Sequence, residues 1–234
     1  MSPTSFVNFT FLPKYASLFV KGIEYTIFIS VVSVLIAILP ALLLALMRLS
    51  KSRIIRSISG AYIAVFRSTP LLVQLALVYY GLFNFVKIPS YQLFGFINLS
   101  MFIPGVVALA LNSAAYVAEI FRAGILAVDS GQNEAARSLG LSATMSMAYV
   151  VLPQAIKNIL PALANEMITM VKESSILSTL GMMELMWAAK TVSATTYITI
   201  GPYVLAALIY FCINYPASKV IEAIERRMRR GDKR

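Results

Sequence analysis

The sequence contains no histidine and a single cysteine, Cys212, which lies inside an apolar run. These absences exclude a zinc site built on His or several Cys, a Ser–His or Cys–His catalytic pair, and an intrachain disulfide. Aspartate occurs only twice, so the cluster of His, Asp or Cys that a membrane-embedded enzyme needs near an interface is missing. The composition therefore argues against an enzyme.

The sequence also lacks the Gly-x-x-x-x-Gly-Lys-Ser/Thr phosphate loop. It offers no recognisable nucleotide site, so any ATP used in its work is expected to bind to a separate chain.

Charged residues are scarce at 13%, whereas hydrophobic residues make up 59% of the 234 positions. A soluble domain carries roughly a quarter charged residues, so this composition is typical of a membrane protein. The net charge of +10 is compatible with nucleic-acid binding. However, the basic residues form short clusters beside apolar runs, as in membrane loops, and we expect no nucleic-acid partner.

The apolar runs predict an all-α integral membrane protein with one domain over 1–234 and about five spans, since a bilayer crossing takes about 20 residues. The first run is too long for a signal-peptide core and lacks a small-residue cleavage site, so we expect it to stay in the mature protein. The expected spans are 22–47, 59–83, 103–122, 161–183 and 202–222.

The basic residues predict the orientation. Fourteen flank the spans on one side and four on the other, which favours a cytoplasmic C-terminus and an external N-terminus. The cytoplasmic set is Arg48, Lys51, Arg53, Arg56, Arg122, Arg137, Lys157, Lys219, Arg226, Arg227, Arg229, Arg230, Lys233 and Arg234, and the external set is Lys14, Lys21, Lys87 and Lys190.

The cytoplasmic loop over about 127–157 has the signals of two short helices. Asp129 or Ser130 can cap the first helix, and a glycine at position 140 can end it in a left-handed conformation. Ser142 can cap the second helix, which Pro153 is expected to limit. A structured loop of this length usually has a function.

This loop resembles a known family. Glu134-Ala135-Ala136, then Gly140, then Leu152-Pro153 match the spacing of the signature of bacterial ABC importer permeases, with Val150 where isoleucine is usual. Further segments resemble the polar amino acid branch of that family, and the resemblance extends from about Gly22 to Tyr215. They are 66–74 (FRSTPLLVQ), 115–124 (AYVAEIFRAG), 163–166 (LANE) and 171–175 (VKESS).

The resemblance implies a set of partners. In the family, the loop forms coupling helices that sit in a groove of a cytoplasmic ATP-binding subunit, which holds the ATP and Mg²⁺; no cofactor is expected in this chain. By position, Glu134, Ala135, Ala136, Gly140 and Pro153 would carry the contact. The other expected partners are a second permease subunit (the same or a related chain), an extracytoplasmic amino acid binding protein, and the lipid of the bacterial inner membrane.

Three charged residues lie deep in the predicted spans. Entering from the cytoplasm at 1.5 Å per residue, Arg67 lies about 13 Å along the second span and Glu173 about 18 Å along the fourth. Glu166 is seven residues before Glu173, so the two carboxylates share one helix face. Charges at this depth line a pathway or pair with each other.

We therefore hypothesise a site for a zwitterion. Arg67 would hold the substrate carboxylate, and Glu166 and Glu173 would hold the ammonium or a basic side chain. Thr69, Gln74 and Asn165 are further substrate-binding candidates. Asn165-Glu166 is similar to the histidine and arginine permeases of the family, which favours a basic amino acid.

Two alternatives stay open at this point. Arg67 and Lys172 could instead neutralise Glu173 and Glu166 as structural pairs, within or between subunits. Glu119, three residues before an arginine at the end of the third span, is better explained as half of a helix-end pair than as a ligand.

The alternative function is a stand-alone channel or ion-driven carrier. That class does not need the loop, and it often shows an inverted repeat that is not evident here.

Overall fold

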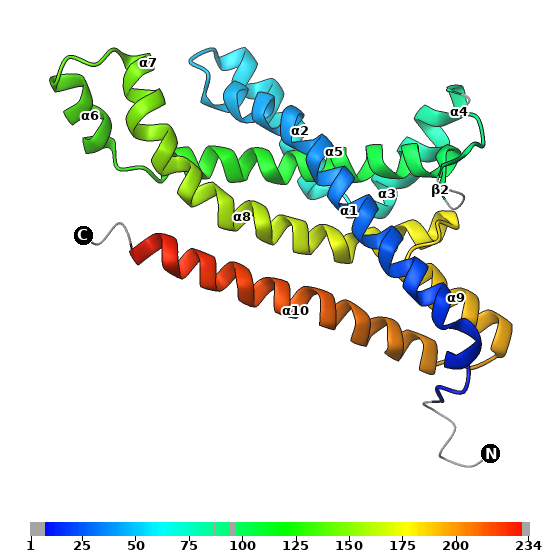
Figure 1. The fold of residues 1–234 in the computed structure, drawn as a ribbon. Helices are drawn as coiled ribbons and strands as arrows, with labels where there is room; N and C mark the ends of the chain where they lie inside the picture. Colours follow the sequence, from blue (N-terminus) through cyan, green and yellow to red (C-terminus); the bar gives the residue numbers. More distant parts are fainter. Residues whose placement is uncertain (1–7, 87, 94–96, 231–234) are drawn as a thin grey trace.

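The computed structural model describes residues 8–86, 88–93 and 97–230, most of which are helical. Figure 1 shows long helices that cross the molecule, with α6 and α7 toward one end and α9 toward the other. The helices are α1 (Leu12–Leu49), α2 (Arg53–Ser68), α3 (Leu71–Ala76), α4 (Phe83–Phe85), α5 (Leu99–Leu126), α6 (Ser130–Ser138), α7 (Ala143–Ser146), α8 (Leu152–Glu173), α9 (Leu185–Thr196) and α10 (Gly201–Arg230). Strands β1 (Gln92–Leu93) and β2 (Ile97–Asn98) pair antiparallel.

Four of the helical stretches are long and apolar enough to cross a bilayer, and α2 together with its bent continuation gives a fifth. The expected all-α membrane architecture is therefore confirmed. α10 packs on α8 and α9, yet only 6% of its apolar window is buried. A helix that exposes this much apolar surface is suited to lipid or to another membrane chain.

α1 packs along α5 through small residues. Ala37, Ala41 and Ala45 are fully buried at four-residue spacing, in a cluster with the alanines of α5. Small side chains let helix backbones approach closely, which is a main source of packing energy inside a bilayer. Gly22 allows a second close approach, because a Cβ there would lie 3.0 Å from the Cα of Leu185 at the start of α9.

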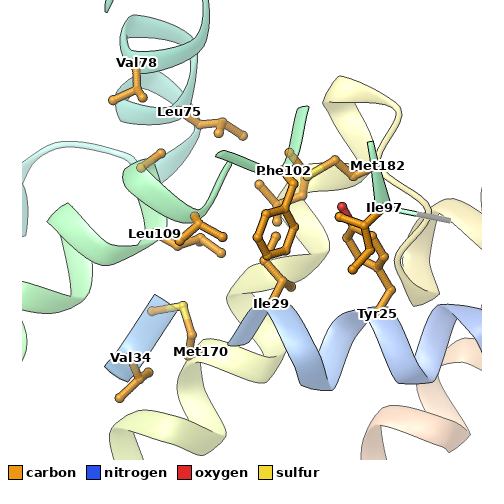
Figure 2. Packing of buried hydrophobic residues seen from close by; sticks show 13 residues of the cluster. Tyr25, Ile29, Val34, Leu75, Val78, Ile97, Phe102, Leu109, Met170 and Met182 are labelled. Atoms are coloured by element: carbon orange, nitrogen blue, oxygen red, sulfur yellow. The ribbon is translucent and has the colours of Figure 1, made fainter. Parts of the chain in front are cut away.

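A larger cluster fills the space between α1, α5 and the end of α8 (Figure 2). Phe102 lies at its centre, with its ring edge-on to Tyr25 at 6.2 Å and stacked on Phe28 at 5.6 Å. Ile97 from β2 and Met182 complete the contacts around it. This packing fixes α5 as the central helix against which the other spans are placed.

The second span is broken in the middle. α2 ends at Ser68, Thr69 and Pro70 are extended, and α3 restarts at Leu71 in a direction bent by 107°. Proline has no N–H to donate and disfavours helix at the residue before it. The loosened backbone expected near Pro70 is therefore present as a complete break, one turn after Arg67.

The prediction that Pro153 ends the second loop helix is wrong. The chain is helical from Ala143 to Leu180, through a π-helical turn at Met147–Val151 and a final 3-10 segment at Ser174–Leu180. The wider π turn absorbs the missing N–H of the proline. The Gln154 side chain also donates to the carbonyl of Val150 at 2.9 Å. Pro153 therefore lies within the first turn of α8.

Candidate functional site

A cavity of about 440 Å³ opens between the end of α2, the second half of α5 and the middle of α8. Its size lies within the range of small-molecule sites. Three charged residues line it, Arg67, Glu119 and Glu166, together with Tyr116 and Asn158. The structure therefore brings together two of the residues that the sequence singled out, Arg67 and Glu166.

Arg67 reaches the cavity from the last turn of α2. Its guanidinium lies over the ring of Tyr116, 5.2 Å from the ring centre, a cation–π contact. Within the described residues, no carboxylate oxygen lies within 4.0 Å of its nitrogens. The alternative pairing of Arg67 with Glu173 is therefore not formed in this chain.

Glu166 faces the cavity from α8 and is only 8% exposed. One carboxylate oxygen accepts a hydrogen bond of 2.8 Å from the Ser113 hydroxyl of α5. Lys172 forms no ion pair with it in the part of the chain that the structure describes. The cavity thus holds a guanidinium and a carboxylate that form no ion pair within 4.0 Å among the described residues, although Arg67 also lies near enough to Glu119 to interact with its charge.

Glu119 is matched. It accepts two hydrogen bonds from Arg122, at 2.8 and 3.0 Å, and lies 3.7 Å from Arg48 of α1. The expected helix-end pair with Arg122 is confirmed, and the structure adds a second partner, Arg48. This cluster fixes the end of α1 against α5 at one rim of the cavity.

The other polar candidates lie elsewhere. Thr69 and Gln74 hydrogen-bond to the backbone at the break between α2 and α3. Asn165 is exposed and lines an adjoining cavity of about 340 Å³ between α8 and α10, which shares Asn158 and Ala162 with the Arg67 cavity. Glu173, the last residue of α8, is half-buried and is not among the residues that line the Arg67 cavity.

The sequence analysis missed four polar residues at or beside the cavity, one of which is Asn158 of α8. Ser113 and Tyr116 lie three positions apart on α5 and so share a face, as their spacing alone could have indicated. Asn112, a lone amide in an apolar run, is 3% exposed and contacts Gln74. A polar side chain in a predicted span was the available signal.

The loop after α5 has the expected caps. The Asp129 side chain accepts from the N–H of Gly131, the Ser142 hydroxyl accepts from that of Met145, and Gly140 has φ +90°. The Asn133 side chain also accepts a 2.6 Å hydrogen bond from the Ser146 hydroxyl, which joins α6 to α7. α6 and α7 therefore form one connected corner at this end of the molecule (Figure 1).

The corner presents a defined surface. Within α6, Ala136 is buried, whereas Glu134 and Ala135 are exposed. Leu139, in the turn between α6 and α7, is 86% exposed, and Tyr149 is 72% exposed. These exposed apolar side chains beside the charged residues of α6 define the surface of the corner.

Glu184 is a buried carboxylate that the sequence analysis did not consider. It is 0% exposed and lies outside the candidate spans, directly before α9. Its oxygens accept hydrogen bonds from the N–H groups of Met186 and Trp187, at 2.7 and 2.6 Å, and from the Tyr210 hydroxyl at 3.0 Å. Burial raises the pKa of Glu184 to about 7, and these donors oppose the rise.

Glu184 predicts a pH-dependent stability. Its pKa in the folded chain is above the ordinary 4.5, so the folded state binds the proton more tightly. Stability therefore falls as pH rises from 4.5 to about 7, by on the order of 3 kcal/mol, and then levels off. Glu184→Gln keeps an acceptor for the helix N-terminus and removes the titration.

The measurement is the apparent Tm in detergent between pH 5 and 8. The Tm of Glu184→Gln is expected to vary less with pH than that of wild type. Glu222→Gln, at an exposed carboxylate on α10 beside Lys219, should keep the wild-type slope. Equal slopes for wild type and Glu184→Gln would contradict the assignment.

Comparison with known proteins decides the family. Residues 33–230 match the family described as binding-protein-dependent transport system inner membrane component. The chain belongs to this family. It is a multi-pass inner membrane protein and a permease subunit of an ABC importer, not an enzyme. Family membership sets aside the stand-alone channel or carrier. In such systems the nucleotide binds to a separate ATPase, and a binding protein delivers the substrate.

Two curated relatives cover almost the whole permease. The putative glutamine transport system permease protein GlnP of Rickettsia conorii is 40% identical over 93% of this chain and 95% of its own length. The arginine transport system permease protein ArtQ of Bacillus subtilis is 42% identical over 91% and 93%.

Solved structures share the fold. A crystal structure of an amino acid ABC transporter with histidines has 48% identity and a TM-score of 0.84, covering 94% of this chain and 99% of its own. The MetNI methionine ABC transporter in an inward-facing form has a TM-score of 0.70 at 19% identity, over 88% and 96% of the two chains, and supports the fold alone.

Proposed function

We propose that this permease carries a polar amino acid across the membrane, between the guanidinium of Arg67 and the carboxylate of Glu166. The observation that carries the proposal is that both groups line one cavity and neither forms an ion pair within 4.0 Å among the described residues. An amino acid has one carboxylate and one ammonium, so it can match both charges. Glu166 is buried, and a buried charge requires such a partner, whereas Arg67 is exposed at the open cavity.

The substrate class that we put first is a basic amino acid. Asn165-Glu166 is similar to the histidine and arginine permeases, and the arginine permease ArtQ is among the relatives. Glu119 does not contribute an anion for a basic side chain, because arginines already neutralise it. Glu173, two turns from Glu166, does not line the cavity, so Glu166 is the carboxylate that would face the ammonium or the basic side chain.

ATP hydrolysis on the partner subunit would be coupled to the cavity through the corner formed by α6 and α7. We place that corner in the cytoplasm, against the ATPase subunit that holds ATP and Mg²⁺, with Glu134, Ala135 and Gly140 in the contact. The support is the exposure of this corner and the excess of basic residues in the segments expected on its side. Pro153 would act indirectly, because it lies in α8 just beyond the π turn.

A second permease subunit, the same or a related chain, would close the path. The cavity with Arg67 and Glu166 is open in the single chain, and five spans enclose little space on their own. Lipid would cover the apolar faces left free.

The test is uptake into proteoliposomes. The permease is co-expressed with its ATPase subunit and reconstituted with candidate amino acid binding proteins. ATP-dependent uptake of radiolabelled arginine, lysine, histidine, glutamine and glutamate is then compared. Uptake of a basic amino acid supports the full proposal. Uptake of glutamine alone keeps the amino acid importer and overturns the basic substrate, and uptake of none of the five overturns the polar amino acid class.

A further inference from the structure

The break in the second span leaves backbone carbonyls without helical donors. The last four carbonyls of any helix lack partners within the helix, and inside a membrane each must find another donor. At the end of α2, the Thr69 hydroxyl donates to the carbonyl of Val65 at 2.8 Å. The next carbonyl, that of Phe66, directly precedes Arg67.

Gln74 supplies the donor for Phe66. Its side-chain Nε2 donates to the Phe66 carbonyl at 2.8 Å, to the Thr69 carbonyl at 3.0 Å and to the Thr69 hydroxyl at 2.8 Å. Gln74 belongs to α3 and is 5% exposed. One side chain from beyond the break thus binds the end of the helix before it.

Asn112 connects this arrangement to the central helix. Its Nδ2 donates to the Gln74 Oε1 at 2.8 Å and lies 3.5 Å from the Phe66 carbonyl. Asn112 is one position before Ser113, which donates to Glu166. The polar contacts at the break and the Ser113–Glu166 hydrogen bond at the cavity therefore meet at neighbouring positions of α5.

We propose that Gln74 and Asn112 are positioning residues that fix the bend between α2 and α3 and so hold Arg67 over Tyr116 in the cavity. Gln74 is not a ligand in this account, because both ends of its amide are occupied. The expected effect of Gln74 and Asn112 on transport rests on the proposed role of Arg67. Their expected effect on the position of residue 67 does not depend on that role.

The first test is arginine affinity, measured by equilibrium binding of radiolabelled arginine to the purified permease–ATPase complex. The binding protein is left out, because it would otherwise set the apparent affinity. Gln74→Met keeps the length of the side chain and removes all four hydrogen bonds of the amide. We expect about tenfold weaker binding in the wild-type background and less than twofold further weakening when Arg67 is already methionine.

The second test reports position alone. Arg67→Cys is made in a Cys212→Ser background, and the rate of labelling by a charged thiol reagent is measured. Gln74→Met is expected to change this rate at least fivefold, and Asn112→Leu, which breaks one link, at least twofold. If Gln74→Met does not accumulate in the membrane, Asn112→Leu decides both tests.

Tyr62→Phe is the matched control. The Tyr62 hydroxyl donates to the carbonyl of Leu111 at 2.8 Å and so joins α2 to α5, and its removal keeps the ring on Phe66 and every hydrogen bond at the break. Affinity and labelling rate should stay within about twofold of wild type. A Gln74→Met labelling rate equal to that of the control overturns the inference, as does a loss of affinity that is undiminished in the Arg67→Met background. If Arg67→Met itself leaves affinity unchanged, the proposed function is wrong, and the labelling rate still decides the positioning role.

Discussion

Glu166→Gln is expected to weaken the binding of arginine to the permease–ATPase complex by about tenfold to a hundredfold, the worth of one charge-assisted hydrogen bond. Glutamine keeps an acceptor for the Ser113 hydroxyl, so the packing of α8 on α5 should persist. The negative charge that would face the substrate ammonium is lost. The measurement is equilibrium binding without the binding protein.

Two comparisons make this prediction specific. Arg67→Met should weaken binding by a similar factor, because the substrate carboxylate loses its guanidinium partner. Arg56→Gln changes an arginine on the same helix that does not line the cavity, so it should leave binding unchanged. Glu173→Gln removes the other carboxylate on that face of α8, and it does not line the cavity, so affinity should stay within about twofold. Equal losses in Glu166→Gln and Glu173→Gln would contradict the site.

Leu139→Asp is expected to reduce substrate-stimulated ATP hydrolysis at least tenfold and to weaken co-purification of the ATPase. Leu139 is 86% exposed in the turn between α6 and α7, so the aspartate costs the permease itself little stability. In an interface, the same change places an unpaired charge against an apolar surface. The measurements are ATPase activity in nanodiscs and the amount of ATPase retained on a tagged permease.

Ala135→Leu separates contact from general damage. Ala135 is exposed on α6, and a larger side chain there would hold a close partner away, whereas Ala136 is buried and its enlargement would disturb α6 itself. Tyr197→Asp is the control at the opposite, α9 end of the molecule, where a residue is also highly exposed. Normal coupling in Leu139→Asp and Ala135→Leu would show that this corner does not bind the ATPase.

Local signals in the sequence were read correctly. Asp129, Ser142 and Gly140 cap and end helices as their side chains and conformational preferences predict. The backbone break near Pro70 and the pair of Glu119 with Arg122 also followed from short-range chemistry. In each case the partners lie within a few residues of each other, so the spacing in the sequence is enough to predict the local contact.

Contacts between distant segments could not be predicted in this way. A π turn lets the helix continue through Pro153, and nothing in single-residue preference indicates the wider turn. Gln74 was among the substrate-binding candidates, and its hydrogen bonds at the break depend on how α3 folds back on α2, which the sequence does not indicate. Glu184 lies in a short link whose burial comes from α1 and α10.

The most direct test of the central claim is whether substrate at the membrane cavity controls ATP hydrolysis at the distant corner. The reconstituted complex is given binding protein loaded with arginine, and ATP hydrolysis is compared between wild type and Glu166→Gln. The account predicts strong stimulation in wild type and a stimulation at least several-fold smaller in the variant, with equal amounts of ATPase retained. Equal stimulation in both would contradict a role for the Arg67–Glu166 cavity in transport.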